Sequence, residues 1–309
     1  MGSTVGVADK NSTAVATERA AALRGLELTV TRRLDGLLQG DYQGLVRGLG
    51  TETGDGRLYV PGDDVRRIDW SLTARMGETH VRDAIADREL TTWAVVDDSA
   101  SMAFGTAACE KRDLAVAAVA AVGFLTARPG NRIGAVVVGS DSTNTTPPRG
   151  GQDGVRALLA RLLSSPRPAD GGGPADLPAA LRRVGRVARR RGLVVVVSDF
   201  VGPLDWEGPL RALAGRHQVL AAEVSDPRDA ELPAVGFLAL VDPETGRRIE
   251  VQTAKPRVRE AFSAAATGSR ADVAAAIRRA GADHLVLSTD RDWVRDIVGY
   301  VASKRRVRQ

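Results

Sequence analysis

The amino-acid sequence predicts an α/β fold built on a doubly wound, mostly parallel sheet, with an N-terminal extended appendage. From about Leu90 onward, short apolar runs alternate with stretches whose apolar residues recur at helical spacing. Several of these runs consist mainly of Val, Leu, Ile and Ala, which is typical of strands buried on both faces. The chain has 309 residues and is 43% hydrophobic, so it can form one large domain with a smaller appendage, or two modest domains.

The predicted elements follow one another in chain order. A helix over 19–38 is followed by extended pieces and loops over 41–88, which are too polar and Gly-rich to bury a core of their own. The strands of the sheet are predicted at 91–96, 132–138, 193–197, 218–224 and 283–288. The helices between and after them are predicted at 111–127, 155–163, 177–190, 204–214, 257–280 and 293–303. A Pro-, Gly- and Thr-rich loop or hairpin is expected at 142–153, and a hairpin joins 237–241 to 248–251.

Four regions are expected along the chain. They are a disordered arm (1–18), a helix and extended segment that packs on the main domain (19–89), the α/β domain (90–303) and a basic tail (304–309). The arm has no apolar core, no run of about 18 apolar residues is present, and Cys109 is the only cysteine. We therefore expect a cytoplasmic protein without a membrane span.

The formal net charge of +5 raises the question of an anionic partner. The densest basic runs are Arg189-Arg190-Arg191 and Lys304-Arg305-Arg306. No interleaved aromatic residues or known binding module accompany them, so nucleic acid is the less favoured partner. A solvated helix end and a solvated tail explain both runs.

The loop after the first strand of the sheet carries the main candidate site. Ligands of open α/β sheets bind beyond the carboxyl ends of the strands. In an extended loop alternate residues point the same way, so Asp97, Ser99 and Ser101 are expected to converge. One carboxylate and two hydroxyls suit Mg²⁺, Mn²⁺ or Ca²⁺ and do not suit zinc. Alternatively, the serines cap the following helix and Asp97 accepts hydrogen bonds from backbone amides.

Two further loops are expected at the same edge. Ser198 and Asp199 follow the strand at 193–197, and Gly172-Gly173-Pro174-Ala175-Asp176 precedes the next helix in the chain, at 177–190. The pattern Asp97-x-Ser99-x-Ser101 after a buried strand resembles the metal-ion-dependent adhesion site of von Willebrand factor type A domains. That resemblance implies Asp199 as a later ligand. The family usually supplies a threonine where this chain has Ala175, so water or Asp176 would replace that ligand.

An upstream stretch resembles a second family. Tyr59-x-Pro61-Gly62-Asp63-Asp64-Val65-Arg66-Arg67-Ile68-Asp69-Trp70 is similar to the signature of the bacterial domain of unknown function 58 family. Its interleaved acids and arginines can form a local ion-pair network with Trp70 as a buried anchor on the α/β domain. Alternatively, the stretch is a partner-docking surface formed by Asp63, Asp64, Arg66, Arg67, Asp69 and Trp70.

The resemblance implies a non-enzymatic adaptor that binds protein partners through a degenerate metal-ion-dependent adhesion site. Members of that family are commonly encoded beside MoxR-type AAA+ ATPases, which implies such an ATPase as partner in assembling or remodelling the complex of a client protein. The alternatives are a metal-dependent hydrolase, with Asp98 or Asp176 as general base, and a basic nucleic-acid-binding protein. The sequence contains no Walker or GxGxxG loop that would predict nucleotide binding.

Overall fold

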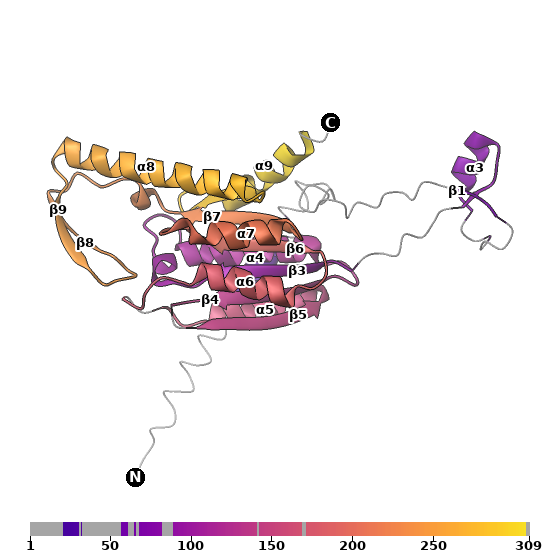
Figure 1. Cartoon of the computed structure of the whole chain (residues 1–309), viewed down its shortest axis with the longest axis horizontal. Coiled ribbons are helices and arrows are strands. Elements are labelled where there is room, and N and C mark those ends of the chain that lie inside the picture. Colours follow the sequence, from indigo (N-terminus) through magenta and orange to yellow (C-terminus); the bar gives the residue numbers. More distant parts are fainter. Residues whose placement is uncertain are drawn as a thin grey trace, which may run out of the picture.

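A computed structural model of the chain describes residues 21–30, 32, 57–60, 65, 68–81, 89–140, 142–168 and 171–306. Its centre is a six-stranded sheet in the order β10-β7-β6-β3-β4-β5 (Figure 1). The strands are β3 (Thr91–Asp97), β4 (Arg132–Val138), β5 (Thr143–Gly150), β6 (Leu193–Ser198), β7 (Gln218–Ser225) and β10 (Asp283–Ser288). All neighbours are parallel except β4 and β5. The predicted doubly wound, mostly parallel sheet is confirmed.

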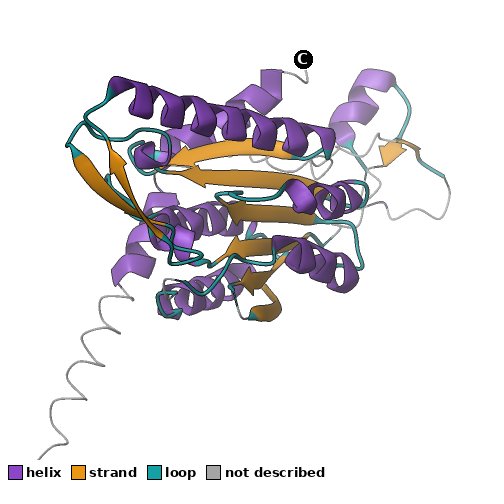
Figure 2. Ribbon diagram, turned by 60° about the vertical axis from the view of Figure 1, so that its left-hand side comes forward, coloured by secondary structure: helices purple, strands orange, loops and turns teal. Residues whose placement is uncertain are grey.

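Helices cover both faces of this sheet (Figure 2). One face packs against α4 (Lys111–Thr126), α5 (Gly151–Ser164) and α9 (Trp293–Arg306). The other face packs against α6 (Leu177–Val187), α7 (Glu207–Ala214) and α8 (Pro256–Arg279). Residues 21–29 are helical, and Val30, the next residue, is 1% exposed in the first of these two cores. Among the described residues, no helix is long and apolar enough to cross a membrane.

The alternation of side chains along β3 shows why these strands read as unbroken apolar runs. Ala94 and Val96 lie in one core, whereas Trp93 and Val95 lie in the other. Because helices cover both faces, a polar side chain at any of these positions would reduce the apolar area buried in one of the two cores. The one charged residue of the strand, Asp97, stands at its carboxyl end, where the chain leaves the sheet.

The segment expected as a loop or hairpin at 142–153 is instead mostly the edge strand β5, with the start of α5 at its end. An edge strand tolerates Pro147 and Pro148 because only one of its sides takes part in the ladder. The register shifts between Ile133 and Ala135 of β4, opposite this stretch. A Cβ on the intervening Gly134 would lie 2.9 Å from a carbonyl oxygen of β5, so glycine allows the close approach.

The N-terminal appendage contains a helix that the sequence analysis missed. α3 (Trp70–Met76) lies beside a two-stranded sheet of β1 (Arg57–Leu58) and β2 (His80–Val81). The Asp69 carboxylate caps α3 by accepting hydrogen bonds from the second and third N–H groups of the helix, both at 3.1 Å. Trp70 is 70% exposed, so the prediction that it is a buried anchor is wrong. The arm 1–18 and Asp63, Asp64, Arg66 and Arg67 lie outside the described residues.

A second small sheet stands next to the carboxyl edge of the main one. β8 (Phe237–Val241) and β9 (Arg248–Gln252) pair antiparallel, as predicted. Figure 2 shows this hairpin on the side toward which the arrows of the parallel strands point. Three short 3-10 helices, η4 (Ala100–Ala103), η5 (Leu204–Trp206) and η6 (Pro227–Asp229), complete the described elements.

Candidate functional site

Asp97 is the last residue of β3 and is 6% exposed. Its Oδ1 accepts a hydrogen bond from the backbone N–H of Ser99 at 3.0 Å, and its Oδ2 accepts one from the Ser198 hydroxyl at 2.6 Å. Burial and the nearby charge of Asp199 raise the pKa of Asp97 to about 6, although the hydrogen bonds from Ser198 and Ser99 oppose the shift. The fold thus holds a carboxylate in a place where its charge is only partly compensated.

The two serines of the loop lie together next to this carboxylate. Ser99 and Ser101 are 3% and 9% exposed, and their Oγ atoms are 3.1 Å apart. Ser99 precedes η4, and its side chain makes no capping hydrogen bond to that helix. The predicted convergence of the two hydroxyls is therefore present, and it does not arise from helix capping.

The turn after β6 carries Ser198 and Asp199, which the sequence predicted at the same edge as Asp97. Because β3 and β6 are parallel neighbours, Ser198 reaches Asp97 directly. The Ser198 Oγ also accepts a hydrogen bond from the N–H of Phe200, which has a φ of +54°. A bulky residue with a positive φ strains the backbone, and such strained residues cluster at functional sites. Asp199 lies at the same edge as Asp97.

Asp199 is paired with a buried cation that the sequence analysis did not consider. The Lys111 Nζ, at the start of α4, lies 2.8 Å from Asp199 Oδ2 and 3.6 Å from Asp229 Oδ2. Burial lowers the pKa of Lys111, but the charges of Asp199 and Asp229 outweigh it and the net pKa is raised. The Asp199 carboxylate is therefore already neutralised by an ammonium group.

Asp176 and Asp98, the two predicted general bases, make their contacts away from Asp97. Asp176 caps α6 by accepting a hydrogen bond from the N–H of Ala179 at 2.8 Å. The Asp98 carboxylate accepts a hydrogen bond from the Ser165 hydroxyl at 2.7 Å and lies 3.9 Å from the Arg112 guanidinium. Neither group has a described contact with Asp97, so neither is placed as a general base for chemistry at that carboxylate.

Glu244, in the turn of the β8–β9 hairpin, enters the site from outside the sheet. Its Oε1 accepts a hydrogen bond from the backbone N–H of Ser101 at 3.0 Å. Its Oε2 is buried and, among the described residues, has no hydrogen-bond partner. A second carboxylate therefore lies against the backbone of Ser101.

The donors at this edge match the chemistry of a hard divalent cation. They are hydroxyl and carboxylate oxygens, which Mg²⁺ and Ca²⁺ prefer. The Oε2 of Glu244 is buried at the same edge and, among the described residues, has no hydrogen-bond donor. Asp97, Ser99 and Ser101 are the residues that would hold the ion. Asp199 is already paired with Lys111, so it fits a position beside the ion better than that of a ligand.

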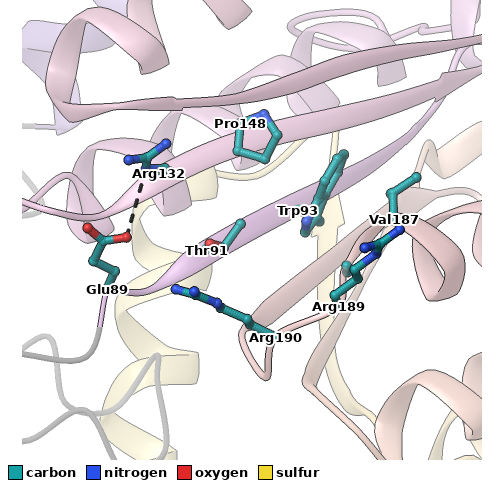
Figure 3. A pocket seen from close by; sticks show the side chains of 9 residues that line it. Glu89, Thr91, Trp93, Arg132, Pro148, Val187, Arg189 and Arg190 are labelled. Atoms are coloured by element: carbon teal, nitrogen blue, oxygen red, sulfur yellow. Dashed lines mark ion pairs between the residues drawn. The ribbon is translucent and has the colours of Figure 1, made fainter.

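A separate cavity lies at the opposite edge of the sheet. It has a volume of about 500 Å³ and begins at Thr91 and Arg132, the first residues of β3 and β4 (Figure 3). Arg189 and Arg190, from the basic run expected to be solvated, line it and are exposed. Arg132 pairs with Glu89 at 4.0 Å. This cavity shares no residue with the Asp97 edge.

Comparison with known proteins identifies the family. Residues 55–272 match the family described as "Protein of unknown function DUF58". The chain belongs to this family. The uncharacterized proteins Mb1516 of Mycobacterium bovis and Rv1480 of Mycobacterium tuberculosis are each 54% identical to this DUF58 protein over 289 residues. The match covers 93% of this chain and 90% of each relative.

Solved structures resemble the DUF58 protein only distantly. The crystal structure of the conserved hypothetical protein BatB from Bacteroides thetaiotaomicron is 16% identical, with a TM-score of 0.42, over 70% of this chain and 99% of that one. The SpRpn10 VWA domain is 14% identical, with a TM-score of 0.37, over 68% and 94% of the two chains. Similarity at this level carries no argument about function.

Proposed function

We propose that this DUF58 protein is a non-enzymatic adaptor that binds protein partners through the carboxyl edge of its sheet. Asp97, Ser99 and Ser101 would hold a divalent cation, with Mg²⁺ as the first candidate and Mn²⁺ or Ca²⁺ as alternatives. The cation would supply an open coordination position for a carboxylate. We include in this proposal a cytoplasmic location, a MoxR-type AAA+ ATPase as partner and a client protein whose complex the pair assembles or remodels.

The pair of hydroxyls beside Asp97 is the observation that carries the proposal. The Oγ atoms of Ser99 and Ser101 are 3.1 Å apart. Adjacent oxygen ligands of an octahedral Mg²⁺ are separated by about 2.9 Å, given metal–oxygen distances of about 2.0–2.1 Å. The two hydroxyls, which share a hydrogen bond, therefore lie close to the spacing that two cis ligands of the cation would need.

The arrangement gives less support to a hydrolase. Metal-dependent hydrolysis needs a general base within reach of the metal-bound water or substrate. Asp98 is held by Ser165 and lies near Arg112, and Asp176 is held by the first turn of α6. Both candidate bases are thus engaged in contacts away from Asp97.

Calorimetry with Mg²⁺ tests the cation site. We expect the wild-type chain to bind Mg²⁺, and Asp97→Ala and Ser99→Ala to weaken binding by about 10–100-fold or more, since each removes a proposed ligand. Ser164→Ala, at the exposed end of α5, is the matched control and should bind as the wild type does. Pull-down of a purified MoxR-type ATPase with and without EDTA then tests the partner. Equal Mg²⁺ affinity in all three variants would contradict the proposal.

A further inference from the structure

The turn of the β8–β9 hairpin is fastened to the candidate site by backbone contacts. The N–H groups of Gly171 and Gly173 donate hydrogen bonds to the carbonyl oxygens of Pro243 and Glu244, both at 2.8 Å. Gly171 and Gly173 have φ values of +80° and +93°, which glycine adopts at little cost. The glycine-rich loop that precedes α6 therefore forms a short ladder with the turn of the hairpin.

The turn is itself stiffened by Asp242. The Asp242 carboxylate accepts hydrogen bonds from the backbone N–H of Glu244 at 3.0 Å and from the Thr245 hydroxyl at 2.5 Å. These bonds hold the turn that presents Glu244 to the site in one conformation.

The Glu244 side chain makes the third contact between the hairpin and the site, and one of its two oxygens lacks a hydrogen-bond donor. One oxygen accepts a hydrogen bond from the N–H of Ser101, the residue whose hydroxyl lies 3.1 Å from that of Ser99. The other oxygen is buried and, within the described part of the chain, accepts no hydrogen bond. A cation bound at this position would supply the partner that the buried oxygen lacks.

We propose that Glu244 completes the cation site in cis and occupies the position that a partner carboxylate would take. This inference rests on the proposed cation site at Asp97, Ser99 and Ser101. A carboxylate of the chain's own hairpin then closes the site until the hairpin withdraws. A partner carboxylate competes with Glu244 for the same position, and the exposed turn is the element that must move.

If Glu244 binds the cation, the bound cation and the docked hairpin stabilise each other. A bound cation attracts the Glu244 carboxylate, so it should also protect the Gly171 and Gly173 amides that the docked hairpin holds. If Glu244 serves only to accept the Ser101 N–H, its replacement by the neutral isostere glutamine preserves that bond and leaves cation binding unchanged. The two roles are separable by a single substitution.

The test compares wild-type protein, Glu244→Gln and Glu250→Gln. Glu250 is exposed on β9, so its variant makes the same charge change on the same hairpin away from the site. We expect Glu244→Gln to weaken Mg²⁺ binding in calorimetry by about tenfold or more, as for loss of a ligand or its close support. Glu250→Gln should match the wild type. Amide exchange of Gly171 and Gly173, followed by NMR, should slow on adding Mg²⁺ in the wild type and not in Glu244→Gln.

The outcomes separate the two proposals. If wild-type protein binds Mg²⁺, Asp97→Ala abolishes binding and Glu244→Gln binds as tightly as wild type, the cis carboxylate is overturned and the cation site stands. If wild-type protein binds none of Mg²⁺, Mn²⁺ and Ca²⁺, the cation site fails and the inference fails with it. Weaker binding in Glu244→Gln together with loss of the Mg²⁺-dependent amide protection supports the cis carboxylate.

Discussion

Lys111 is the residue on which the charge balance of the carboxyl edge depends. Its ammonium is buried 2.8 Å from Asp199, at the first position of α4. Removing one member of a buried ion pair leaves the other charge uncompensated. We expect Lys111→Met to lower the free energy of unfolding by about 3–5 kcal/mol in urea titrations. The double variant Lys111→Met/Asp199→Asn should recover much of that loss, and a double variant no more stable than Lys111→Met would show that the two groups are not coupled.

The Lys111–Asp199 pair illustrates why a local sequence motif predicts only part of a site. The alternation of Asp97, Ser99 and Ser101 predicted their convergence, because side-chain direction in an extended loop is a local property. Lys111 lies 88 residues from Asp199, and Glu244 lies 143 residues from Ser101. Contacts at such separations depend on how whole elements pack, so no spacing in the sequence indicates them. The DPETG hairpin was predicted, whereas its docking partner was not.

At the scale of elements, Asp226 joins three segments at the end of the sheet. Its Oδ2 accepts hydrogen bonds from the Thr106 N–H at 2.8 Å and the Thr289 hydroxyl at 2.5 Å, and its Oδ1 accepts from the Thr106 hydroxyl. This residue, 1% exposed, therefore connects the loop before α4 to the ends of β7 and β10. Burial raises the pKa of Asp226, but these hydrogen bonds outweigh it and the net pKa is lowered.

The lowered pKa fixes the sign of a pH effect on stability. The carboxylate of Asp226 stabilises the folded state above the unfolded-state pKa of about 3.9, and this stabilisation is lost as pH falls through the lower folded-state value. Asp226→Asn has one acceptor oxygen in place of two and should cost about 1–3 kcal/mol at pH 7. Urea titrations at pH 7 and pH 3 should show a smaller difference between variant and wild type at the lower pH. An equal difference at both pH values would exclude an ionic contribution.

The elements of the sheet were predictable because burial on both faces leaves a strong signal. The apolar run 193–197 corresponds to β6 within one residue, and the run 132–138 coincides with β4. α3 was missed because it has only seven residues and none of them is buried, so no apolar periodicity marks it. β5 was missed because its Thr and Pro residues are typical of loops, and only its place at the sheet edge makes the strand possible.

At the scale of the whole molecule, the structure changes the expected role of Trp70. The sequence predicted a buried anchor whose loss would cost about 3–5 kcal/mol, yet this side chain is 70% exposed. We now expect Trp70→Ala to change the free energy of unfolding by no more than about 0.5 kcal/mol, as for other surface substitutions. Trp206→Ala is the matched control, because Trp206 is 3% exposed and its ring centroid lies 5.0 Å from that of Phe200. That control should cost about 3–5 kcal/mol.

A binding assay tests whether the exposed Trp70 contacts a partner protein. Trp is enriched among the residues that dominate binding energy at protein interfaces, so the exposed Trp70 is a candidate docking residue. Asp69, which caps the same helix, would then fix the orientation of that helix toward the partner. Pull-down of a purified MoxR-type ATPase by Trp70→Ala should fall while the melting temperature stays at the wild-type value. A melting temperature lowered as far as that of Trp206→Ala would instead show that Trp70 is buried on the α/β domain in solution.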